Sequence, residues 1–290
     1  MRKKEKIIAL IELIRLDKPI GTLLLLWPTL WALWIASEGW PEIKLLFVFI
    51  LGTFLMRSAG CIVNDFADRD LDGFVERTAS RPLVTGSVSR KEAFGLFGAL
   101  IFFSFLLVLQ TNLLTIKLSI AALGLASIYP FLKRYTNLPQ LGLGVAFSWG
   151  IPMAFAAQKS SIPVDAWVLL SANLLWVLIY DTQYAMVDRE DDLQVGIKST
   201  AILFGKADRH IIGFLQLVCL ICLCLVARQF SLGLPYLFSI FLVALLFLYH
   251  LYLIRHRERQ NCFEAFKHNN WIGFCILLGI IFDYACRYSF

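Results

Sequence analysis

The chain has 290 residues, of which 59% are hydrophobic and only 17% are charged, and its mean hydropathy is +0.70. Soluble domains carry about 25% charged residues, so this composition excludes an ordinary soluble enzyme and predicts an integral membrane protein with several spans. The net charge of +6 is distributed among short segments between apolar runs, which does not indicate a nucleic-acid-binding surface. The expected macromolecular environment is the lipid bilayer, and no obligate protein partner is evident.

Nine apolar runs approach the length of about 20 residues that a membrane-spanning helix needs. They lie near 19–37, 43–64, 92–110, 112–132, 139–157, 164–185, 209–227, 232–254 and 270–288. Alternation across the membrane places the N-terminus and segments 65–91, 133–138, 186–208 and 255–269 on one side, which then holds most of the 27 Lys and Arg residues. The positive-inside rule makes that side cytoplasmic. We therefore predict an all-α bundle of nine transmembrane helices.

Two acidic stretches begin where apolar runs end. In the first, Asn64, Asp68 and Asp72 recur every four residues, so on a helix they share one face. In the second, one helical face would carry Asp181, Tyr184, Asp188 and Asp192. Carboxylates at this spacing repel one another unless a cation neutralises them. Each stretch therefore predicts an acidic helix face that binds a cation.

The two acidic stretches also resemble each other. Residues 68–72 read DRDLD and residues 188–192 read DREDD, and each group ends an even-numbered span. We expect an internal repeat, 19–132 and 139–254, followed by a ninth helix at 270–288. Within a single domain covering 1–290, such a repeat would bring both acidic faces into one shared site.

The chemistry of this site follows from its residue types. Carboxylate and amide oxygens suit Mg²⁺, which is usually completed by substrate phosphates. Arg and Lys follow each acidic stretch and suit a polyphosphate. At the edge of a membrane cavity, this combination fits an amphiphile with a diphosphate head and a hydrocarbon tail, such as a prenyl diphosphate. Release of pyrophosphate leaves an allylic cation, so the site must neutralise the leaving group and exclude water.

Several motifs resemble a known family. Asn64-Asp65-x-x-Asp68-x-x-x-Asp72 and Asp181-x-x-Tyr184-Ala185-x-x-Asp188-x-x-x-Asp192 are similar to the two signatures of the UbiA superfamily of intramembrane prenyltransferases, and the resemblance covers almost the whole chain. Residues 15–21 (RLDKPIG), 77–83 (RTASRPL) and 129–136 (YPFLKRYT) resemble its 4-hydroxybenzoate polyprenyltransferase branch.

That resemblance implies an activity and a location. The fold would be a UbiA-type bundle with a lateral opening to lipid, capped on the cytoplasmic side by the connections between spans two and three and between spans six and seven. The enzyme, with Mg²⁺ as cofactor, would transfer a polyprenyl group from polyprenyl diphosphate to the ring carbon ortho to the hydroxyl of 4-hydroxybenzoate, an early step of ubiquinone biosynthesis. It would lie in the bacterial inner membrane with its active site facing the cytoplasm.

The resemblance also implies residue roles. The metal ligands would be Asn64, Asp68, Asp72, Asp188 and Asp192, with Asp70 outside the metal shell. The substrate-binding cations would be Arg15, Arg57, Arg77, Arg81, Lys133, Arg134 and Lys198, among which Arg15 and Arg57 are both candidates for the acceptor carboxylate. The expected catalytic residues are Asp181, Tyr184 and Asp65. Asp181 and Tyr184 lie deeper in the membrane and would position the acceptor ring or take up its proton, whereas Asp65 could instead pair with a base.

Other interpretations stay open at this point. A UbiA-type enzyme can act on a naphthoate, haem, chlorophyllide or glycerol-phosphate acceptor. Paired acidic motifs in repeated halves also occur in secondary transporters, although transporter sites lie near mid-membrane, whereas these carboxylates end their spans. The stripe of Trp27, Trp31 and Trp34 favours packing over a channel lining. Prenyl chain length, oligomeric state and the base that removes the ring proton do not follow from the sequence.

Overall fold

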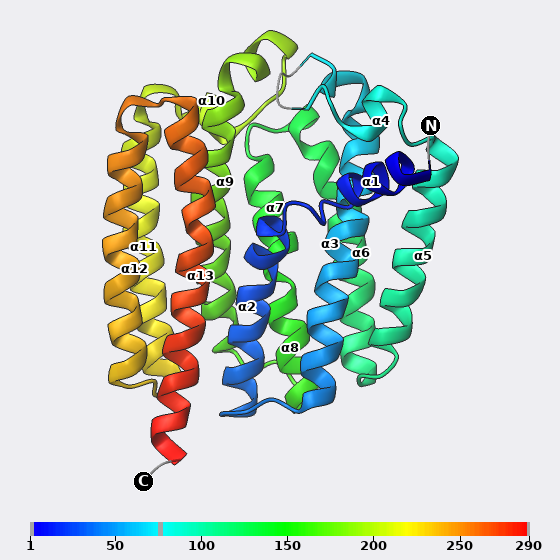
Figure 1. Ribbon diagram of the computed structural model, residues 1–290. Helices are drawn as coiled ribbons and strands as arrows, with labels where there is room; N and C mark the ends of the chain where they lie inside the picture. The colour runs from blue at the N-terminus through cyan, green and yellow to red at the C-terminus, as the bar shows by residue number, and fades with distance from the viewer. Residues whose placement is uncertain (1–2, 75–77, 289–290) are drawn as a thin grey trace.

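The computed structural model describes residues 3–74 and 78–288, without the side chains of residues 3, 70–72 and 288, and the regular elements of this part are all helical. Long helices run side by side in one bundle (Figure 1). In chain order the elements are α1 (Lys3–Leu13), α2 (Ile20–Ser37), α3 (Ile43–Asp72), α4 (Pro82–Thr85), α5 (Arg90–Val108), α6 (Leu113–Tyr135), α7 (Pro139–Ser148), α8 (Gly150–Lys159), α9 (Ala166–Val195), α10 (Thr200–Phe204), η1 (Gly205–Ala207), α11 (Asp208–Gln229), α12 (Leu234–Leu253), η2 (Ile254–His256) and α13 (Arg259–Tyr288).

Within the described residues, eight helical segments are long and apolar enough to cross a membrane. They are Ile20–Ser37, Ile43–Arg69, Arg90–Val108, Leu113–Tyr135, Pro139–Lys159, Thr200–Gln229, Leu234–His256 and Arg259–Arg287. The expected count of nine is not confirmed, because α9 is not among these segments. Its sequence carries polar residues, including Asn173, Asp181, Thr182 and Gln183, although it stands within the bundle beside α7, α11 and α13 (Figure 1).

Two expected boundaries change in the structure. The expected loop 255–269 is wrong, because α13 begins at Arg259 and Cys262, Ala265 and Asn269 on its first turns are fully buried. The expected span 139–157 consists of two helices, α7 and α8, that meet at Ser148 and Gly150. Gly150 permits this junction to approach α2, since a Cβ there would collide with Thr29.

The core lies between α2, α9 and α13, where tryptophans pack. Trp31 and Trp176 are each 1% exposed, with ring centroids 5.3 Å apart. Trp31 Nε1 donates to the Gly273 carbonyl and Trp176 Nε1 donates to Asn269 Oδ1, each at 2.9 Å. Trp27 Nε1 donates to Asn270 Oδ1 at 2.9 Å. These side chains pack one helix against the next, which fits the interpretation of the tryptophan stripe as packing.

The helices α5 and α6 form the outer side of the bundle beside α3 (Figure 1). Large apolar side chains on them face outward, including Phe102, Phe103 and Ile120, which are 55% to 68% exposed. Exposed aromatic and aliphatic groups on long apolar helices fit contact with lipid chains. The chain is therefore an integral membrane protein.

One end of the bundle carries the short helices α4 and α10 (Figure 1). They lie in the connections that follow α3 and α9 respectively, and α1 crosses the bundle near α4. Both acidic stretches are therefore continued by short helical segments at the same end. The cytoplasmic cap and the internal repeat stay predictions, since neither membrane sidedness nor repeat symmetry follows from this arrangement alone.

Candidate active site

The two acidic stretches are the C-terminal parts of α3 and α9, which both continue as helices beyond their apolar segments. Asp68 is 2% exposed, Asp188 is 9% exposed and Asp192 is 8% exposed. Asn64 is half-buried, and its Oδ1 accepts a hydrogen bond from the Tyr129 hydroxyl at 3.5 Å. The side chain of Asp72, another expected ligand, lies outside the described residues. Buried carboxylates at two helix ends must be paired with cationic side chains or with a metal ion, because an unpaired buried charge is energetically costly.

The end of α6 connects the two acidic segments. Lys133 Nζ forms an ion pair with Asp68 Oδ2 at 2.5 Å. The carbonyl of the same lysine accepts the backbone N–H of Lys198, in the segment after α9, at 3.2 Å. Lys198 Nζ donates to the Tyr135 carbonyl at 3.4 Å, and Arg134 donates to the Ala67 carbonyl. Three of the expected diphosphate-binding cations thus lie at one junction between α3 and the connection after α9.

Asp65 forms a separate charged cluster. Arg15 Nη2 donates to both Asp65 oxygens, at 2.7 and 2.8 Å, and Arg81 Nη1 lies 3.1 Å from Oδ1. The Asp65 side chain is 1% exposed. Arg15 reaches it from a left-handed backbone conformation with φ +58°. These three expected site residues pair with one another, and Arg77, the fourth expected residue of this region, lies outside the described residues.

An apolar cavity of about 250 Å³ opens between α2, α3, α5, α6, α7 and α8. Arg57 and Tyr129 line it together with six Ser and Thr residues. Arg57 Nε is buried and has no hydrogen-bond partner among the described residues, and its guanidinium lies 5.7 Å from the Phe147 ring centroid. Gly21 leaves space for this side chain, because a Cβ there would lie 2.7 Å from Arg57 Nη2. An arginine with an unused donor beside an apolar cavity is suited to an anionic ligand.

Asp181 and Tyr184 lie one to two turns before Asp188 on α9, and both are half-buried. The Tyr184 ring packs against Phe266 of α13 at 4.5 Å between centroids and against Phe263 at 6.2 Å. Packing of this kind fixes the orientation of the tyrosine. No described contact assigns Asp181 or Tyr184 a catalytic role, which stays a prediction.

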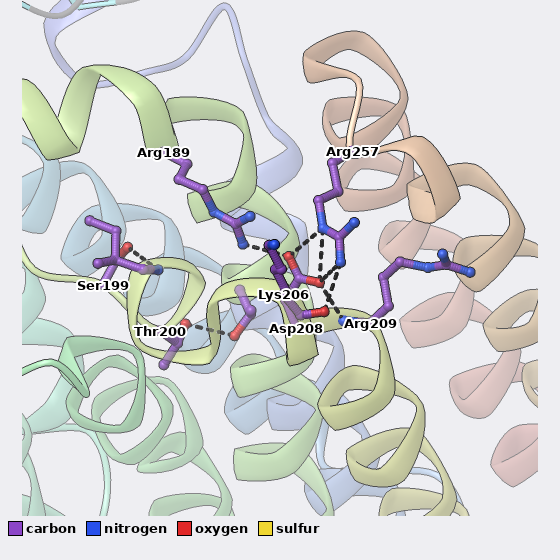
Figure 2. A network of polar contacts seen from close by, with 9 residues as sticks. Arg189, Ser199, Thr200, Lys206, Asp208, Arg209 and Arg257 are labelled. Carbon is purple, nitrogen blue, oxygen red and sulfur yellow. Dashed lines mark hydrogen bonds and ion pairs between the residues drawn. The ribbon is translucent and has the colours of Figure 1, made fainter.

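Sequence reasoning missed a second charged cluster, shown in Figure 2. Asp208, at the start of α11, is 0% exposed and accepts from Arg189 of α9 at 2.5 Å and from Arg257 Nη2 at 2.8 Å. Arg259 forms ion pairs with Asp191 at 2.9 Å and with Glu190 at 3.1 Å. The sequence signal for this cluster was Asp208 itself, which directly precedes an apolar run. A charged residue at the start of a membrane-spanning segment needs a partner of opposite charge.

The fit of the acidic helix ends to Mg²⁺ depends on the ligand atoms that they offer. No group of three or more His, Cys, Asp or Glu in the described part of the chain could hold a metal ion. The donor set at the ends of α3 and α9 nevertheless consists of carboxylate and amide oxygens, which Mg²⁺ prefers. Mg²⁺ is commonly held by one or two carboxylates together with substrate phosphates. The residues therefore fit a metal ion that arrives with a diphosphate.

Comparison with known proteins agrees with this arrangement. The UbiA prenyltransferase family matches residues 25–271. The 4-hydroxybenzoate octaprenyltransferase of Aeromonas hydrophila is 57% identical over 97% of this chain and 98% of its own length. The apo structure of a UbiA homologue from Aeropyrum pernix K1 has a TM-score of 0.80 at 26% identity, covering 91% of this chain and 98% of that one.

A structure of a UbiA homologue from Archaeoglobus fulgidus bound to GPP and Mg²⁺ has a TM-score of 0.74 at 16% identity and covers 94% of this chain and 99% of that one. At this identity the likeness concerns the fold. The match to the family model and the identity to the Aeromonas protein both extend over most of the chain. The chain therefore belongs to the UbiA prenyltransferase family.

Proposed function

We propose that this protein transfers a polyprenyl group from polyprenyl diphosphate to the ring carbon ortho to the hydroxyl of 4-hydroxybenzoate, as an early membrane step of ubiquinone biosynthesis. The observation that carries the proposal is the pair of buried acidic helix ends on α3 and α9, joined through the end of α6. An apolar cavity runs beside α3. The name of the Aeromonas relative supports the choice of acceptor.

The diphosphate would be held at the acidic helix ends. The proposed metal ligands are Asn64, Asp68, Asp72, Asp188 and Asp192. Bound Mg²⁺ would neutralise the diphosphate as it leaves. Lys133 and Lys198 lie at the junction between the two acidic segments and would contact the remaining diphosphate oxygens. The buried Asp68 carboxylate would also keep Lys133 directed toward the site before the substrate arrives.

The two organic parts of the reaction would occupy the apolar cavity and its polar end. The polyprenyl chain would extend along the cavity toward lipid, where water is excluded and the allylic cation is protected from hydrolysis. Arg57 would bind the carboxylate of 4-hydroxybenzoate, because its Nε is buried and lacks a hydrogen-bond partner among the described residues. Arg15 is the weaker candidate, since both of its bonds to Asp65 are already made.

Asp181 and Tyr184 would face the acceptor ring from α9. Attack of the ring carbon on the allylic cation forms a carbon–carbon bond, and the ring then loses one proton. A carboxylate such as Asp181 can accept that proton, while Tyr184, held by Phe266, would orient the ring. Asp65 would act indirectly, through its bonds to Arg15 and Arg81.

The proposed location is the bacterial inner membrane, with the acidic helix ends facing the cytoplasm. Support comes from the basic residues of the segments at that end and from the positive-inside rule. The chain would act as a single domain, 1–290, built on an internal repeat.

The test uses full-length protein purified in liposomes, radiolabelled polyprenyl diphosphate, 4-hydroxybenzoate, and either Mg²⁺ or EDTA. The proposal predicts a prenylated hydroxybenzoate with Mg²⁺ and none with EDTA. Omission of 4-hydroxybenzoate is the control for hydrolysis. Transfer to a naphthoate but not to 4-hydroxybenzoate would refute the acceptor, and the absence of transfer to any aromatic acceptor would refute the reaction.

A further inference from the structure

The Asp208 cluster joins three elements near the acidic end of α9 (Figure 2). Arg189 Nη2 of α9 donates to Asp208 Oδ2, and Arg257, between η2 and α13, contacts both oxygens at 2.8 to 3.1 Å. The backbone N–H of Arg209 donates to Oδ1 at 2.7 Å. A buried carboxylate with this many charged donors is a fixed anchor, because removing it leaves guanidinium groups without their partner.

Arg189 lies within the acidic stretch itself, directly after Asp188 and three residues before Asp192. Side chains three residues apart on a helix are neighbours, so the Arg189 guanidinium is within reach of Asp192. In the described part of the chain, the ion-pair partner of Arg189 is Asp208. Asp208 therefore holds a positive charge away from the carboxylates proposed to bind Mg²⁺.

Arg257 and Arg259 reinforce the anchor from the other side. Arg257 Nη2 also donates to the Lys206 carbonyl at 2.9 Å, and Arg259 pairs with Asp191 and Glu190 on α9. The hydrogen bond to Asp208 raises the pKa of Arg257 above its ordinary value, so this guanidinium stays charged. The end of α9 is thereby tied to the starts of both α11 and α13.

We propose that Asp208 is a positioning residue for the metal-diphosphate site, which acts by pairing with Arg189 so that this guanidinium does not compete with Mg²⁺ for Asp188 and Asp192. The inference rests on the metal role proposed for Asp188 and Asp192. Without Asp208, the Arg189 guanidinium would pair with Asp192 and compete with the metal ion. The consequence is weaker metal-dependent binding, which removal of Arg189 should reverse.

The test measures binding rather than turnover. Full-length protein in lipid nanodiscs is titrated with Mg²⁺ at a fixed concentration of geranyl S-thiolodiphosphate, an unreactive diphosphate analogue, and bound analogue is measured. For Asp208→Asn the half-saturating Mg²⁺ concentration should rise by about 10- to 100-fold, as for other residues that orient metal ligands. For the double variant Asp208→Asn, Arg189→Ala it should return to within about threefold of wild type, because the competing charge is gone.

Asp283 supplies a matched control. It is 2% exposed, accepts the Gly233 N–H at 2.5 Å and pairs with Arg287 at 2.8 Å. It belongs to the C-terminal end of α13, at the opposite end of the bundle from α4 and α10 (Figure 1). Asp283→Asn removes a comparable buried ion pair and should leave the half-saturating Mg²⁺ concentration unchanged.

Arg189→Ala alone keeps the test independent of whether Asp208→Asn folds. It should bind Mg²⁺ and the analogue at least as well as wild type. The proposal is refuted if Asp208→Asn folds with unchanged Mg²⁺ dependence, if the double variant shows no recovery, or if Arg189→Ala itself raises the half-saturating concentration tenfold. Absence of Mg²⁺-dependent binding in wild type would refute the proposed metal role itself, and with it this inference.

Discussion

Asp65 and Asp208 are both buried and each pairs with two arginines, but the two clusters are assembled in opposite ways. In the N-terminal half the aspartate belongs to the acidic stretch, and Arg15 and Arg81 reach it from other segments. In the C-terminal half the acidic stretch supplies the arginine, Arg189, and the aspartate comes from α11. The first cluster removes a negative charge from its acidic stretch, whereas the second removes a positive charge.

This difference teaches that similar motifs do not contribute equally to a shared site. Asp65 is paired with arginines, and Lys133 forms an ion pair with Asp68. The α3 side therefore contributes both cations and oxygen ligands to the proposed site. Because Arg189 pairs with Asp208, the α9 side contributes carboxylates to this site. We therefore expect the two halves to be unequal in function, with the stronger lysine contact to diphosphate, from Lys133, on the α3 side and metal binding weighted to α9.

The largest effect should come from removing one carboxylate on either side. Asp68→Ala and Asp188→Ala should each lower the rate of prenyl transfer by more than about 100-fold, since even residues that merely support metal ligands change activity 10- to 100-fold. The measurement is product formation at saturating Mg²⁺. Both proteins should remain inserted and folded by size-exclusion chromatography, and near-normal turnover in either one would contradict the shared site.

Substitution of Arg57 should distinguish binding of the acceptor from binding of the diphosphate. Arg57→Ala should raise the KM for 4-hydroxybenzoate by about 10- to 100-fold, because a hydrogen bond to a charged group contributes about 1.5–3 kcal/mol. The KM for polyprenyl diphosphate should change little. Arg15→Ala is the companion variant, and a larger acceptor effect in Arg15→Ala than in Arg57→Ala would reverse the assignment.

The two lysines distinguish the sides of the junction. Lys133 forms a short ion pair with Asp68, whereas the Lys198 ammonium makes a 3.4 Å contact with a carbonyl. Lys133→Met should therefore raise the KM for the diphosphate by about tenfold, equivalent to about 1.4 kcal/mol, and Lys198→Met should raise it less. Equal effects in steady-state assays would show that both ammonium groups contact the substrate.

Asp65 should act on stability more than on chemistry. Asp65→Asn removes the carboxylate charge that faces Arg15 and Arg81, and we expect a loss of about 1–3 kcal/mol in unfolding free energy, measured by denaturant titration in detergent micelles. Residual folded protein should retain its Mg²⁺ dependence. A shift in that dependence with unchanged stability would instead place Asp65 among the metal ligands.

The smallest effect is expected at the opposite end of the bundle. A hydrogen bond from Lys159 lowers the pKa of Glu38 below its ordinary value of 4.5. The Glu38 side chain is 69% exposed and the Lys159 side chain is 37% exposed. Glu38→Gln should cost less than about 1 kcal/mol at pH 7. Because the pKa of Glu38 is lower in the folded state, its carboxylate stabilises the fold at pH values above its ordinary pKa. This stabilisation is lost as the pH falls through the lowered pKa of the folded state.

The difference between wild type and Glu38→Gln should therefore disappear in acid. Thermal midpoints at pH 7 and in strong acid measure it, with the exposed Glu42→Gln as a control. A difference that grows as pH falls would contradict the pairing of Glu38 with Lys159.

Local pattern predicted much of the fold. Apolar runs gave the bounds of α2, α5 and α11 to within a few residues, because length and hydropathy decide where a helix crosses lipid. The spacing of Asn64, Asp68, Asp188 and Asp192 predicted helical faces, and α3 and α9 are helical there. The start of α13 was missed because residues 259–269 are largely polar, yet Cys262, Ala265 and Asn269 are fully buried in the bundle.

Charge pairing could not be predicted in the same way. Arg15 and Asp65 are 50 residues apart, and Arg257 and Asp208 are 49 apart. With 27 basic residues in the chain, sequence spacing does not select a partner. The sequence predicts Arg15 as a candidate for the acceptor carboxylate and Arg81 as a candidate for the diphosphate, and in the structure both contact Asp65. Asp208 was assigned no role from the sequence. Partners are selected by which helix ends meet, and this depends on the tertiary fold.

The most direct measurement is Mg²⁺-dependent binding of geranyl S-thiolodiphosphate to wild type, Asp68→Ala and Asp188→Ala in nanodiscs. A shared site predicts one analogue molecule bound per chain in wild type, none with EDTA, and none in either variant at the same Mg²⁺ concentration. Full binding by either variant, or two analogue molecules per chain in wild type, would show that the acidic ends of α3 and α9 do not form one site.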